Sequence, residues 1–147
     1  MVRSPEKRGT ALDTLVENVI GAAYEVSNIL GAGFLERVYE RALAHELALR
    51  GFKVQTQAPF AVAYKSQMVG DFAADLLVED QLIVELKCSA AFTNEHLAQC
   101  INYLKASRLR LALLINFQKP RVEWRRVVYS GAAPERAADE VAANGRE

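Results

Sequence analysis

The sequence predicts an α/β protein, with a mixed β-sheet flanked by helices in the order helix, helix, strand, strand, strand, helix, strand, strand. Apolar residues recur at helical spacing through the first third of the chain, whereas the middle holds β-rich runs separated by short polar turns. A further helical pattern then lies between two strands. A connection of that kind joins parallel strands, so the sheet is expected to be mixed.

Length and composition fit a single globular domain of 147 residues. No apolar run approaches the ~20 residues of a membrane span. The chain carries 18 basic and 18 acidic residues, which argues against a basic coat for nucleic acid but leaves room for a local basic groove. Residues 1–10 are largely polar and charged, and residues 131–147 are mostly alanine, glycine and charged residues, so we expect flexible ends, no signal peptide and one domain over residues 11–130. The lone cysteines Cys88 and Cys100 form no CxxC pair and fit a reducing compartment, so we expect a cytoplasmic protein.

Two helices are predicted in the first third of the chain. Over residues 12–30 apolar side chains recur every three or four positions, until the sequence Gly-Ala-Gly at 31–33 interrupts the pattern. The pattern resumes over residues 34–50. Gly51 then stands where a helix C-terminal cap is expected.

The remaining elements are predicted from alternation, turns and caps. Residues 53–64 alternate loosely around Pro59, which indicates an edge strand or a bulge. Thr93 is typical of a helix N-cap, and its helix is expected to end near Ser107. Residues 110–116 are a continuous apolar run, typical of a central strand. The other expected strands are residues 69–78, 82–88 and 122–128.

The hairpin of residues 69–88 carries a charged constellation. If its loop centres on Asp80, Leu77 faces Ile83 and Asp75 faces Glu85, while alternation gives residues 72, 74, 76 and 78 a separate apolar face. Opposed carboxylates repel each other, and partly buried ones are costly unless they are neutralised.

Lys87, on the same face as Asp75 and Glu85, neutralises one carboxylate. A divalent cation such as Mg²⁺ neutralises both and keeps positions for water and phosphate. The alternative is a structural ion pair.

This constellation has the form D-x9-E-x-K and resembles the signature of the PD-(D/E)XK nuclease superfamily, with Ala74 in place of the proline. The sequence GFLERVY at residues 33–39 resembles the GxxExxY family of that superfamily. HLAQCINYL at 96–104 and LLINF at 113–117 are similar to the elements that follow in that family. The resemblance covers about residues 12–128 and implies a restriction-endonuclease-like core.

The resemblance also implies a site and an activity. The activity is that of a Mg²⁺- or Mn²⁺-dependent endo- or exonuclease that hydrolyses phosphodiester bonds of DNA, as a homodimer whose two copies reach two strands. The metal ligands are Asp75 and Glu85. The catalytic residues implied are Asp75, Glu85, Lys87, Gln99 and Glu36. The expected nucleic-acid-binding residues are Tyr39, His96 and Tyr103, together with Arg121 and Arg125, which belong to a cluster of basic residues around the last strand.

Alternatives to these roles stay open. Tyr39 also fits an ordinary core position, and His96 fits a solvated or structural one. Arg121 and Arg125 also fit an edge strand that uses charge to block aggregation. For the whole chain, the alternative is a catalytically inactive nuclease-fold protein that acts as an interaction or nucleic-acid-binding module.

Overall fold

The computed structural model describes residues 10–132, and it confirms the predicted order of helices and strands. The parts of the expected flexible ends at residues 1–9 and 133–147 lie outside the described residues. The predicted bounds agree within two residues. The elements are α1 (Ala11–Leu30), α2 (Glu36–Leu49), β1 (Val54–Tyr64), β2 (Gln67–Val78), β3 (Leu82–Lys87), α3 (Asn94–Ser107), β4 (Leu111–Asn116), β5 (Glu123–Val128) and a short 3-10 helix, Ser130–Ala132.

The five strands form one mixed sheet in the order β1-β2-β3-β4-β5. β3 and β4 are parallel and are joined through α3, whereas the other neighbouring pairs are antiparallel. β4 is buried at every position, as its continuous apolar sequence predicts. Within residues 10–132, no helix has the length and apolar character needed to cross a membrane.

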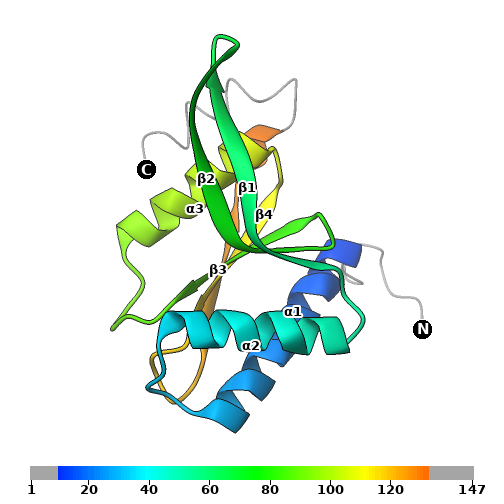
Figure 1. Ribbon diagram of the computed structural model, residues 1–147, viewed down its shortest axis with the longest axis vertical. Coiled ribbons are helices and arrows are strands. Elements are labelled where there is room, and N and C mark those ends of the chain that lie inside the picture. The colour runs from blue at the N-terminus through cyan, green and yellow to red at the C-terminus, as the bar shows by residue number, and fades with distance from the viewer. Residues whose placement is uncertain (1–9, 133–147) are drawn as a thin grey trace, which may run out of the picture.

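Helices cover both faces of the sheet (Figure 1). α1 and α2 pack on one face, in a core that includes Val19 and Leu113. α3 packs on the other face, in a core that includes Leu104 and Leu114. Thr93 caps α3, as its sequence position predicts. The face that carries the acidic residues therefore lies under a layer of protein, and its carboxylates are partly removed from water.

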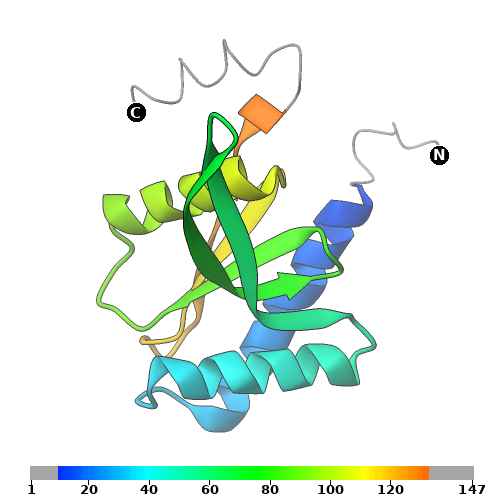
Figure 2. The same ribbon diagram turned by 45° about the horizontal axis from the view of Figure 1, so that its top comes forward.

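The β1–β2 ribbon bends at Gln57, and its outer half rises away from the sheet (Figure 2). The backbone of Gln57 has φ +49°, a left-handed conformation that residues other than glycine rarely adopt. The single apolar face expected along residues 72–78 is therefore wrong. Leu76 belongs to the core under α1 and α2, whereas Ala74 belongs to the core under α3. Asp75 lies between them, at the bend.

Tyr39 closes the loop between α1 and α2 from inside the core. Its side chain is 1% exposed, and its ring stacks on Phe117 with 4.7 Å between ring centroids. Its hydroxyl donates to the Gly31 carbonyl oxygen at 2.5 Å and accepts from the Phe34 N–H at 3.2 Å. Because the ring and the hydroxyl are both engaged, the geometry supports the core alternative for Tyr39 over contact with nucleic acid.

Replacing Tyr39 by phenylalanine should lower the free energy of unfolding by about 1–3 kcal/mol, because two part-buried backbone groups lose their partner. Urea unfolding measures the change. Tyr24→Phe is the matched control on the surface of α1 and should shift stability by less than about 0.5 kcal/mol. Equal effects of the two substitutions would contradict a structural role for the Tyr39 hydroxyl.

Candidate active site

Strands β2 and β3 pair through only three residue pairs and then diverge. The ladder has the predicted register, with Leu77 opposite Ile83, and it ends one pair later. Beyond that point side chains replace the backbone partners. The Asp75 N–H donates to Glu85 Oε1 at 2.9 Å, and the Leu86 N–H donates to Asp75 Oδ2 at 2.9 Å. The two carboxylates are thus fixed as cross-strand neighbours where the sheet opens.

Glu85 is the most strongly perturbed carboxyl of this opening, and it is 3% exposed. Burial, followed by the negative charge of Asp75, raises the pKa of Glu85 to about 8. The hydrogen bond from the Asp75 backbone and the positive charge of Lys87 act in the opposite direction and offset only part of the shift. A cation placed beside Glu85 would stabilise its ionised form, so the opening is chemically suited to hold one.

α2 brings Glu36 toward the same opening from its first turn. Burial and the negative charge of Asp75 raise the pKa of Glu36, whereas Lys87 and a hydrogen bond from the Cys88 backbone lower it. These couplings join Glu36 electrostatically to both diverging strands. The structure therefore groups Glu36 with Asp75, Glu85 and Lys87.

A cleft of about 430 Å³ opens between α2 and the bend of the β1–β2 ribbon. Gln57 spans it, because its Nε2 atom donates to Glu40 Oε2 at 2.9 Å and to Asp75 Oδ1 at 3.3 Å. The cleft is lined by Glu36, Arg37, Glu40, Arg41, Thr56, Gln57 and Asp75. The bend thus gives Asp75 an opening to solvent that a straight ribbon would lack.

α3 reaches Lys87 through a chain of polar contacts. Lys87 Nζ donates to Gln99 Oε1 at 3.3 Å, and Gln99 Nε2 donates to the Tyr103 hydroxyl at 2.8 Å. The Tyr103 ring stacks on Phe72 with 4.0 Å between centroids, and burial raises the pKa of Tyr103 to about 12. Gln99 and Tyr103, four residues apart on one helix face, therefore hold the end of Lys87 in the site.

His96 lies on the same helix, which it caps. Its Nδ1 atom accepts a hydrogen bond from the Thr93 N–H at 3.2 Å. Partial burial and the nearby charge of Lys87 lower the pKa of His96, so the neutral ring is favoured. Arg121 and Arg125 lie elsewhere: both are exposed, next to or on β5, and no contact joins them to the acidic cluster within residues 10–132.

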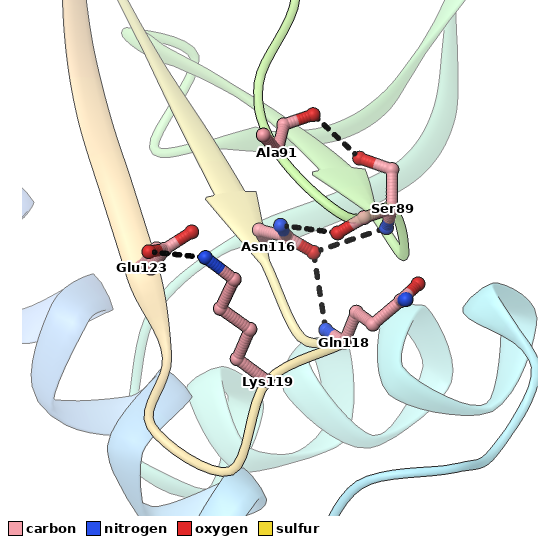
Figure 3. Close-up of polar contacts among 6 residues, drawn as sticks. All are labelled: Ser89, Ala91, Asn116, Gln118, Lys119 and Glu123. Carbon is pink, nitrogen blue, oxygen red and sulfur yellow. Dashed lines mark hydrogen bonds and ion pairs between the residues drawn. The ribbon is translucent and has the colours of Figure 1, made fainter.

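Asn116 is a site-supporting residue to which the sequence analysis gave no role (Figure 3). It is fully buried at the end of β4, opposite Lys87 in the parallel ladder. Its Nδ2 atom donates to the Ser89 carbonyl oxygen at 2.8 Å, and its Oδ1 atom accepts from the N–H groups of Ser89 and Gln118 at 3.2 and 3.0 Å. The segment that follows Lys87 is thereby tied to the end of β4. The signal in the sequence is one amide at the end of an apolar run.

Comparison with known proteins yields one family. The model of the PD-(D/E)XK nuclease superfamily matches residues 13–127, a range that contains every candidate site residue. Two solved structures are similar to the chain. An alkaline exonuclease (LHK-Exo) from Laribacter hongkongensis has 12% identity and a TM-score of 0.43, with 82% of this chain and 83% of that chain covered. SSO0001 has 13% identity and a TM-score of 0.44, with 82% and 78% covered. No curated protein matches the chain in sequence.

The raised pKa of Glu85 predicts a specific dependence of stability on pH. A carboxyl that is harder to ionise in the folded state stabilises the fold at low pH, and that contribution is lost as the pH rises from about 4.5 to about 8. Without divalent metal, the wild-type melting temperature should therefore fall over this range by more than that of Glu85→Gln. Glu25→Gln, which removes an exposed acid of α1, should follow the wild type. Parallel curves for wild type and Glu85→Gln would contradict the prediction.

Asn116→Ala should lower the free energy of unfolding by about 1–3 kcal/mol, because it removes three hydrogen bonds from part-buried backbone groups. Denaturant unfolding measures the loss, and the exposed Asn28→Ala is its control. Amide hydrogen exchange at Ser89 and Gln118 should accelerate in Asn116→Ala. Unchanged exchange at both amides would contradict the role of Asn116 in tying the Ser89 segment to the end of β4.

Proposed function

The chain belongs to the PD-(D/E)XK nuclease superfamily, and we propose that it hydrolyses phosphodiester bonds of DNA with Mg²⁺ or Mn²⁺ as its cofactor. One observation supports this proposal above the others. Asp75 and Glu85 are held together at the opening of the sheet, Glu85 is buried, and Lys87 is anchored beside them. Buried acids of this kind are costly for stability, so the arrangement favours a functional role.

The donor set fits a small, hard cation. Mg²⁺ is usually bound through one or two carboxylates and keeps several waters, so Asp75 and Glu85 suffice as protein ligands. Within residues 10–132, no group of three or more His, Cys, Asp or Glu side chains is arranged to hold a metal. Glu36 is therefore proposed as a partner for the waters of the ion. When bound, the ion would supply Lewis acidity for the phosphate and lower the pKa of a water molecule.

The protein's own residues would orient the substrate. The Lys87 ammonium, held by Gln99, carries the positive charge that a phosphodiester and the attacking water need beside them. Tyr103 holds the Gln99 amide in place. Hydrolysis adds water across one P–O bond and leaves a phosphate monoester and a hydroxyl. Because negative charge builds up on the phosphate oxygens in the transition state, a positive group beside them lowers the barrier.

Further features of the proposal concern partners. We assign the chain to the GxxExxY family on the pattern of Gly33, Glu36 and Tyr39, and we infer a cytoplasmic homodimer, because two copies would present two sites to two strands. His96, Tyr103, Arg121 and Arg125 are the proposed contacts to nucleic acid. Tyr39 fits the core instead. Sedimentation tests the homodimer separately from the activity.

Purified protein should cleave DNA when Mg²⁺ or Mn²⁺ is present, and Lys87→Met and Glu85→Gln should each lower the cleavage rate by at least about 100-fold. Metal should raise the melting temperature of the wild type and of Lys87→Met, which keeps both ligands, but not that of Glu85→Gln. The exposed Glu25→Gln should behave as wild type.

Cleavage is measured on linear duplex, single-stranded and plasmid DNA, with RNA as a comparison. Cleavage that persists in EDTA would contradict metal dependence. If the wild type shows no cleavage and metal does not raise its melting temperature, the alternative of an inactive nuclease-fold module is supported.

A further inference from the structure

The formal net charge of zero conceals a strong separation of charge along the chain. Residues 96–128 carry seven lysines and arginines and one acid, Glu123, whereas residues 10–95 carry six lysines and arginines and twelve acids. The first segment forms α3, β4 and β5, which are neighbours in the fold. Positive charge therefore gathers on the α3–β5 side of the molecule, beside the acidic opening between β2 and β3.

A groove of about 570 Å³ runs between α3 and β5 on this side. Its floor is apolar, with Leu97, Ile101 and Val127, and its rims carry Lys105 from the helix and Arg125 from the strand. Neither cation has an acidic partner among the residues that the structure describes. Both charges are therefore available to a ligand.

The other cations of residues 96–128 are of two kinds, paired and unpaired. Lys119 pairs with Glu123 at 3.1 Å, as Figure 3 shows, and Arg126 pairs with Asp13 at 2.6 Å. By contrast, no ion pair within residues 10–132 involves Arg108, Arg110 or Arg121, all of them exposed. A ligand with several negative charges in a row matches this distribution better than a single anion does.

α3 connects the groove to the candidate active site. On one flank of the helix Tyr103 accepts from Gln99, which contacts Lys87, and the other flank lines the groove with Ala98 and Lys105. A helix with its side chains is about 10–12 Å across, so α3 separates the groove from Lys87 by about one helix diameter.

We propose that the groove between α3 and β5 binds the phosphate backbone of the nucleic acid, on the opposite flank of α3 from the bond that is cleaved. This inference rests on the proposed function for its substrate. It adds Lys105 to the contacts and gives Arg125 a defined position in them. It also assigns α3 a double role, with catalysis on one flank and backbone binding on the other. The outer side of α1, whose sequence carries three acids and no lysine or arginine, is left free of nucleic acid.

The test measures binding without cleavage. Fluorescence anisotropy in EDTA, with a labelled 20-nucleotide single strand and its duplex, gives Kd at several salt concentrations. In the double variant Lys105→Ala, Arg125→Ala, Kd should rise at least tenfold near 0.1 M salt, and the slope of log K against log salt should fall by about two. Lys65→Ala removes one exposed positive charge at the tip of the β1–β2 hairpin, away from the groove, and should change neither value.

The outcomes separate this inference from the proposed function. An unchanged Kd and salt slope in the double variant would overturn the assignment of the groove as a nucleic-acid site. If the wild type nevertheless cleaves DNA, the proposed nuclease activity stands. Loss of binding in the double variant, together with a wild type that cleaves nothing, would support the groove and overturn the nuclease. A wild type that binds anionic vesicles or polyglutamate but neither DNA probe would overturn the groove as a nucleic-acid site.

Discussion

The parting of β2 and β3 at Asp75 and Glu85 is the constraint on which the rest of the site depends. Two paired strands would satisfy their backbone groups with each other and leave the carboxylates to repel across the ladder. Here each carboxylate accepts a backbone N–H of the other strand instead. These two hydrogen bonds satisfy the backbone N–H groups of Asp75 and Leu86 where the strands part. They also hold the Asp75 and Glu85 carboxylates next to each other. The helices, the bend and the Lys87 chain are arranged around that opening.

Sequence reasoning predicted what depends on periodicity and fixed spacing. The element order, the register of Leu77 opposite Ile83 and the Thr93 cap followed from alternation, apolar spacing and capping chemistry. The bend at Gln57 could not be predicted, because a left-handed conformation at a glutamine has no glycine to mark it. This bend places Ala74 in the core under α3 instead of with Leu76, and it opens the cleft beside Asp75. The role of Asn116 depends on which two loops meet at β4, and only tertiary structure decides that.

The buried acids of the site are costly for the stability of the fold. Glu85 is buried against the charge of Asp75, while Glu36, at the start of α2, is raised in pKa by the same causes to a smaller degree. Lys87 opposes both shifts, but its single charge acts on both Glu36 and Glu85, and the pKa of each stays raised. A fold selected for stability alone would replace such a cluster with apolar residues. Its presence inside an otherwise well-satisfied core agrees with the use of this site for chemistry.

Lys87 is restrained from two directions, which gives the cluster its geometry. Its backbone is fixed by the Phe117 N–H, which donates to the Lys87 carbonyl oxygen at 2.9 Å, and its ammonium group is held by Gln99. The first restraint comes from the end of β4 and the second from α3, which is the crossover between β3 and β4. The parallel pairing of β3 with β4 thus requires the helix that holds the lysine. The same crossover brings the cationic groove beside the acidic opening, so one topological feature sets both the position of Lys87 and the approach of a polyanion.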